Sequence, residues 1–121
     1  QKSGDKVITN ESHNFSIDWA VICKLAAISG VDSIHVGMIG GYLNENENYI
    51  NNIVKNLLEY NVISALSCGL NAQLIPLLDT ILGANYMANV GGAIHSHMEG
   101  SEAGAKKIRD AIDLFYRQKI I

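Results

Sequence analysis

The chain has 121 residues, of which 48% are hydrophobic and 17% are charged, and its net charge is −3 with a pI near 5.7. This composition is typical of one globular domain, and it excludes a disordered chain and argues against nucleic-acid binding. No apolar run approaches the roughly 18 residues of a membrane span, and no signal peptide is visible, so we expect a cytoplasmic protein with no membrane partner.

The first elements in chain order are a polar end and a helix. Residues 1–13 are polar and are expected to form a tail or a cut end, so the structured part should span residues 14–121. Ser16 can cap a helix that Gly30 would end. Apolar residues recur at helical spacing between them and predict the face that packs on the core. These residues are Ile17, Val21, Leu25 and Ile28.

Three short apolar runs then alternate with helical patterns. Strands are expected at residues 33–36, 62–66 and 86–90. Helices are expected at residues 50–58, at 74–82, where Pro76 fits only the first turn, and after a loop that runs to Gly100. This alternation predicts a parallel sheet with covering helices, because βα crossovers are right-handed.

A sheet of only three strands has two open edges, which indicates that the chain is part of something larger. We expect the chain alone to self-associate, because four apolar strand residues would lack a cover. These residues are Ile34, Val36, Ile63 and Met87.

Glycine follows each strand, at Gly37, Gly69 and the pair Gly91-Gly92. Glycine at the point where a strand gives way to a helix lets backbone N–H groups approach an anion closely. Because the carboxyl ends of parallel strands meet at one edge of a sheet, these segments predict a phosphate-binding rim.

Cysteine and histidine offer two weaker candidates. We expect Cys23 and Cys68 to be thiols rather than a disulfide, and Cys68 to be a small buried residue rather than a reactive thiolate. His95 and His97 could supply half of a metal site, but hydrogen bonds within the loop are the favoured interpretation, because Glu99 is the only further ligand nearby.

The three strand regions together resemble the RuBisCO large-chain family. Residues 13–37 are similar to the approach to its sixth barrel strand and to that strand, and Ser67-Cys68-Gly69 with Pro76 is similar to the seventh strand and its loop. Residues 89–105 are similar to the eighth strand, its phosphate loop and the final helix. The archaeal branch and the RuBisCO-like proteins are the most similar. The resemblance implies the last three βα units of a (β/α)8 TIM-type barrel.

The resemblance also implies which residues form the site. His35 matches a histidine that contacts the substrate phosphate region, and Ser67 matches a serine that hydrogen-bonds a substrate hydroxyl. Gly69, Gly91 and Gly92 match backbone donors to phosphate. The implied partners are a sugar bisphosphate and either the remainder of the barrel or another copy of the chain.

The departures from the family pattern concern its chemistry. Tyr42 stands at the position of a loop lysine that stabilises the carboxylation transition state, and the phenol of tyrosine is neutral at neutral pH and supplies no cation. Asn44 stands for a glutamate, and Cys68 and Ala93 stand for glycines. The family's magnesium-binding Lys-x-Asp-Glu motif is absent from this chain, so no cofactor is expected in this segment.

Several functions therefore stay open. The chain can be the C-terminal barrel segment of a ribulose-1,5-bisphosphate carboxylase/oxygenase, contributing the phosphate-binding side and inactive alone. It can instead belong to a RuBisCO-like enolase or isomerase that acts on a related sugar phosphate, which Tyr42 favours. A non-catalytic module for sugar-phosphate binding or assembly is the remaining hypothesis.

Overall fold

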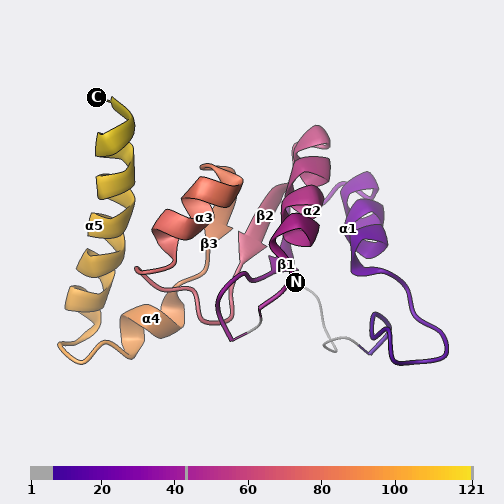
Figure 1. The fold of residues 1–121 in the computed structure, drawn as a ribbon, viewed down its shortest axis with the longest axis horizontal. Helices are drawn as coiled ribbons and strands as arrows, with labels where there is room; N and C mark the ends of the chain where they lie inside the picture. Colours follow the sequence, from indigo (N-terminus) through magenta and orange to yellow (C-terminus); the bar gives the residue numbers. More distant parts are fainter. Residues whose placement is uncertain (1–6, 43, 121) are drawn as a thin grey trace.

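The computed structural model describes residues 7–42 and 44–120 and shows alternating strands and helices. Its elements are α1 (Trp19–Ile28), β1 (Ser33–Gly37), α2 (Glu47–Glu59), β2 (Ile63–Leu66), α3 (Ile75–Leu82), β3 (Tyr86–Ala88), α4 (Gly91–His95) and α5 (Ser101–Ile120). The strands form one parallel sheet in the order β1-β2-β3. Helices α1, α2, α3 and α5 lie beside one another in chain order (Figure 1), and each packs on the next. The predicted parallel sheet with covering helices is confirmed.

The strand register decides which side chains meet the helices. Ile34 pairs with Ser64, and the face that they share packs under the helices, so Ile34 and Val36 are buried at 8% and 0% exposure. The prediction that these two residues lack a cover is therefore wrong, because alternate strand residues point to opposite faces. The prediction is confirmed for Ile63 and Met87, which are 48% and 45% exposed on the other face.

Helix α1 buries a different face from the predicted one. Trp19, Cys23 and Ala27 point into the core, and the Trp19 indole N–H donates a hydrogen bond to the Val36 carbonyl at 3.0 Å. That bond fixes the rotation of the helix, because a buried indole N–H needs a partner. The predicted stripe consequently faces outward, with exposures between 48% and 61%. Its residues are Ile17, Val21, Leu25 and Ile28.

The ends of the helices follow ordinary capping chemistry, and the elements differ from the predictions at three points. Asp18, not Ser16, caps α1 by accepting a hydrogen bond from the Ala20 N–H at 2.8 Å. Gly30, at a φ of 90°, follows the end of α1 as predicted. Strand β3 ends at Ala88, and the expected loop to Gly100 contains the short helix α4. No helix of the described chain is long and apolar enough to cross a membrane.

Two tyrosine–carboxylate hydrogen bonds tie elements together. The Tyr86 hydroxyl donates to Asp79 Oδ1 at 2.8 Å and joins β3 to α3, while the Tyr49 hydroxyl donates to Asp18 Oδ1 at 2.9 Å and joins α2 to the start of α1. Burial, and then the hydrogen bond to Asp79, raises the pKa of Tyr86 well above its usual value. Burial and the bond to Asp18 raise the pKa of Tyr49 to about 12.

The tyrosine bonds predict a loss of stability at alkaline pH. Because the folded chain holds the Tyr86 proton more tightly than the unfolded chain, this stabilisation is complete below about pH 10 and is lost as the pH rises toward the folded-state pKa. In urea unfolding, Tyr86→Phe should therefore lose less stability between neutral and alkaline pH than the wild type. Tyr60→Phe, at the exposed end of α2, is the control, and equal pH slopes for Tyr86→Phe and wild type would contradict the prediction.

The outward stripe of α1 and the exposed sheet face predict that the chain self-associates, as measured by light scattering. Leu25→Lys should weaken association without lowering the melting temperature, because Leu25 is 56% exposed. Leu57→Lys is the matched control on α2. Leu57 is 1% exposed, so a lysine there should unfold the chain. A monodisperse wild-type monomer at high concentration would refute the prediction, and unfolding by Leu25→Lys would contradict the rotation of α1.

Candidate functional site

The loops after the three strands enclose a cavity of about 510 Å³, which we call the rim cavity. Three of the predicted site residues, Ser67, Gly69 and Gly92, line it. Tyr42 also lines the rim cavity, whereas His35 and Gly91 lie outside its lining. The other lining residues are Cys68, Leu70, Asn71, Asn89, Ala93 and Ser96, so no lining side chain carries a full charge.

His35 belongs to β1, and its imidazole ring hydrogen-bonds to one residue just after β2 and to one just after β3. Its Nδ1 atom is 3.3 Å from Ser67 Oγ, and its Nε2 atom is 3.4 Å from Asn89 Nδ2. The register places Ala65 between His35 and Met87, and a methyl side chain leaves the imidazole room to reach across the sheet. The predicted pair His35 and Ser67 is thus brought together, and Asn89 joins it.

Asn89 is a residue that the sequence analysis missed. A signal was present, because Asn89 is a polar residue at the carboxyl end of an apolar strand, two residues before the Gly91-Gly92 segment. Its neighbour in the cavity, Asn71, organises the start of α3. The Asn71 Oδ1 atom accepts hydrogen bonds from the Gln73 and Leu74 N–H groups at 2.9 and 3.2 Å.

Two loops meet backbone to backbone at the edge of the cavity. The Tyr42 N–H donates to the Cys68 carbonyl at 2.8 Å, and a Cβ atom at Gly41 would collide with that carbonyl. Gly69 has a φ of 95°, and a Cβ atom there would lie 2.9 Å from the Tyr42 nitrogen. Gly41 and Gly69 are therefore required by the fold. The Tyr42 side chain, 91% exposed, projects from this contact.

Gly91 and Gly92 are different, because the fold does not require glycine at either position. A Cβ atom at either residue would meet nothing within 4 Å, and neither residue has a positive φ. Both lie in α4, where glycine is a poor helix former. The space beside these two residues is thus open to a ligand.

Cys68 departs from its prediction. Its side chain is exposed rather than buried, and its backbone has a φ of 74°, a conformation that costs a non-glycine residue about 1–2 kcal/mol. The residue adopts this conformation because its carbonyl must meet the Tyr42 N–H. As predicted, neither Cys68 nor Cys23 forms a disulfide.

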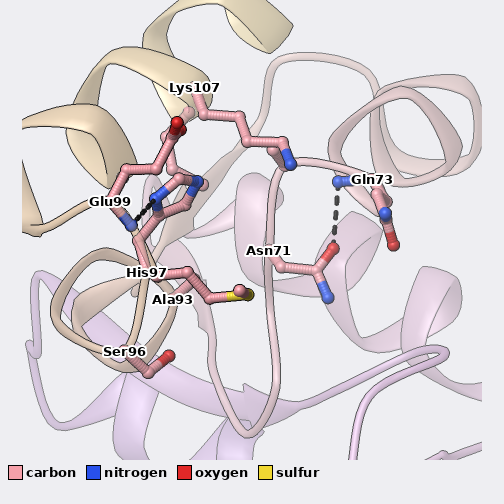
Figure 2. A pocket seen from close by; sticks show the side chains of 11 residues that line it. Asn71, Gln73, Ala93, Ser96, His97, Glu99 and Lys107 are labelled. Atoms are coloured by element: carbon pink, nitrogen blue, oxygen red, sulfur yellow. Dashed lines mark hydrogen bonds between the residues drawn. The ribbon is translucent and has the colours of Figure 1, made fainter.

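A second cavity of about 600 Å³ lies between the loop after β2, α4 and the first turns of α5 (Figure 2). His97 and Glu99 lie on one side, and the Lys107 side chain reaches toward Gln73 on the other (Figure 2). His97 Nδ1 accepts a hydrogen bond from the Glu99 N–H at 3.3 Å, and His95 Nδ1 lies 3.3 Å from Ser101 Oγ. These bonds support the interpretation of the two histidines as loop-ordering residues.

Magnesium does not fit the residues of this site. The ion prefers carboxylate and water oxygens, and the rim cavity is lined by neutral side chains. Within residues 7–42 and 44–120, no group of three or more histidine, cysteine, aspartate or glutamate side chains is placed to hold a metal.

Fold and site together define a class: a parallel α/β segment with polar side chains gathered at the carboxyl ends of its strands. No protein-family model matches the sequence. Among solved structures, the chain is similar to octameric ribulose-1,5-bisphosphate carboxylase/oxygenase from Pyrococcus horikoshii in complex with sulfate ion, with 32% identity, a TM-score of 0.83 and coverage of 93% of this chain and 27% of that one. A rubisco-like protein from Burkholderia fungorum shares the fold at a TM-score of 0.75 and 21% identity, over 92% of this chain and 29% of that one.

Curated relatives agree with the structures. The ribulose bisphosphate carboxylase of Pyrococcus furiosus is 38% identical over 99 residues, which cover 76% of this chain and 23% of that protein. A 2,3-diketo-5-methylthiopentyl-1-phosphate enolase of Bacillus velezensis is 40% identical over 47 residues, which cover 39% of this chain and 12% of that protein. The chain thus belongs to the RuBisCO large-chain family and has the fold of three βα units of its TIM-type barrel. It spans about a quarter of the length of these carboxylases.

The backbone conformation of Cys68 predicts that Cys68→Gly stabilises the chain by about 1 kcal/mol, because glycine adopts a positive φ without strain. Urea unfolding measures the difference. Asn61→Gly is the matched control at the other positive-φ residue that is not glycine among those described, with a φ of 57°. It should gain less, because asparagine tolerates this region. A destabilised Cys68→Gly variant would contradict this prediction. It would show that the Cys68 side chain stabilises the folded chain by more than its positive φ costs.

Proposed function

We propose that the chain contributes the phosphate-binding side of a RuBisCO-type active site and binds a sugar bisphosphate or a related phosphorylated ligand. The observation that carries the proposal is the open space at Gly91 and Gly92, which the fold leaves unexplained. Phosphate oxygens need close approach to N–H donors, and glycine is the residue that permits it. The sulfate ion in the complex of the Pyrococcus horikoshii enzyme is a tetrahedral dianion similar to phosphate.

The neutral lining of the rim cavity limits what this segment does by itself. Ser67 and backbone N–H groups can orient an anion, but Tyr42 supplies no positive charge where the family has a loop lysine. Loss of one electrostatic donor of this kind costs roughly 100- to 1,000-fold in rate. We therefore assign the metal-dependent chemistry to residues outside this chain, in the remainder of a barrel.

Two parent reactions fit this role. Most of the similarity is to ribulose bisphosphate carboxylases, which favours carboxylation of an enolised sugar bisphosphate as the parent activity. The similarity to a phosphate-ester enolase, together with Tyr42, supports the alternative of a RuBisCO-like enolase or isomerase. A module that only binds or assembles is the third candidate, and turnover of ribulose 1,5-bisphosphate by this chain with magnesium would exclude it.

Calorimetric titration with ribulose 1,5-bisphosphate tests the binding proposal. Gly92→Leu should weaken binding at least about tenfold by filling the space beside the ligand. A loss of about 1.4 kcal/mol of binding free energy corresponds to a tenfold increase in Kd. Its melting temperature should be unchanged or higher, since leucine is a better helix former than glycine.

Ala105→Leu, on the exposed side of α5, is the control and should bind as the wild type does. Absence of binding to the wild-type chain would defeat the proposal. Equal affinity for wild type and Gly92→Leu would show that the ligand binds somewhere else.

A further inference from the structure

We propose that Asn89, His35 and Ser67 form a directed chain of hydrogen bonds, in which Asn89 fixes the ring proton of His35 on Nδ1 and thereby aims the Ser67 hydroxyl at an anionic oxygen in the rim cavity. Asn89 is then a positioning residue. The identity of the anion rests on the proposed function, whereas the direction of the hydrogen bonds rests on the geometry of three side chains.

The first step of the chain follows from what an amide nitrogen can do. Asn89 Nδ2 lies 3.4 Å from His35 Nε2. An amide nitrogen carries two hydrogens and accepts none, so Nε2 must be the acceptor and must lack a hydrogen. A neutral imidazole in this state carries its proton on Nδ1.

The second hydrogen bond makes the Ser67 oxygen an acceptor and leaves its hydroxyl hydrogen available to a further acceptor. His35 Nδ1 lies 3.3 Å from Ser67 Oγ, so the Nδ1–H group donates and the hydroxyl oxygen accepts. The hydroxyl then has its own hydrogen left to donate. In the structure a thiol is within its reach, since Ser67 Oγ lies 3.6 Å from the sulfur of Cys68.

A ligand oxygen can replace that thiol. Sulfur is a weak hydrogen-bond acceptor, while an ionised phosphate oxygen is a strong one. Ser67 and Cys68 both line the rim cavity, so an anion that enters it meets the hydroxyl directly. Each bond in such a chain polarises the next, so the Ser67 donor is strengthened by His35 and, through it, by Asn89.

This direction changes the role of His35. Both ring nitrogens are engaged, one by Asn89 and one by Ser67, and the ring lies outside the lining of the rim cavity. His35 therefore acts on the ligand through Ser67 instead of contacting it directly. The series of hydrogen bonds combines one residue of β1 with the residues that directly follow β2 and β3. No single segment of the sequence therefore indicates it.

NMR of the full chain labelled with ¹⁵N at histidine tests the proposal, because long-range ¹H–¹⁵N couplings show which ring nitrogen carries the proton. His35→Asn identifies the signals of His35. We expect the Nδ1–H form in the wild type at neutral to mildly alkaline pH, although neutral histidine in water favours the Nε2–H form. A wild-type ring with its proton on Nε2 would overturn the proposal.

Variants at Asn89 give the matched comparison. Asn89→Asp replaces the donor with an acceptor and should move the proton to Nε2, while Asn89→Leu should return the ring to the preference seen in water. Asn52→Leu, on the exposed side of α2, should leave the ring unchanged. Circular dichroism confirms that each variant is folded. A ring that keeps its Nδ1 proton in both folded Asn89 variants would refute the assignment.

Titration with inorganic phosphate provides a second readout. Asn89→Leu and Ser67→Ala should each weaken binding roughly 3- to 10-fold, the loss expected for one hydrogen bond. The double variant should be no weaker than Ser67→Ala alone, because both changes break the same chain. Additive losses would contradict the relay. Failure of the wild type to bind any phosphate defeats the proposed function, and the NMR result then decides the hydrogen-bond chain separately.

Discussion

Parallel pairing of β1, β2 and β3 in chain order is the constraint on which the site depends. It brings the carboxyl ends of all three strands to one edge, and it pairs Ala65 with both His35 and Met87. A single-residue slip in either pairing would exchange the two faces of a strand. His35 would then point into the helices, and Ile34 would take its place at the site. The buried face under α1 and α2 therefore specifies the position of the imidazole as firmly as any polar contact does.

Glycines in this chain serve two separate purposes. Gly41 and Gly69 allow two loops to meet at the Tyr42–Cys68 hydrogen bond, and they would be needed whether or not anything binds. Gly91 and Gly92 leave space that no protein atom fills. Cys68 belongs with the first group, since its positive φ follows from the same loop contact.

The buried face of a helix could be predicted from the sequence where a single hydrophobic periodicity dominates. Helix α2 alternates apolar and polar residues cleanly, and the apolar face that this spacing indicates is buried at Ile50, Ile53, Val54 and Leu57. Helix α1 is apolar on two faces, and periodicity alone could not choose between them; the Trp19 hydrogen bond to Val36 decides. Helix α4 has five residues, begins with two glycines and lacks a side-chain cap, so it carries almost no local signal. Asn89 was missed because its partner is 54 residues away.

The order of the strands has a consequence for how the chain holds together. Each strand pairs only with its neighbour in the sequence, and helices pack in the same succession from α1 to α5. Such an arrangement is close to one-dimensional, as in repeat proteins, where stability is a sum of unit terms and nearest-neighbour interfaces. A destabilising substitution in α1 would affect the stability of α5 only through the units that lie between them. Hydrogen exchange should accordingly vary along the chain as a gradient from one βα unit to the next.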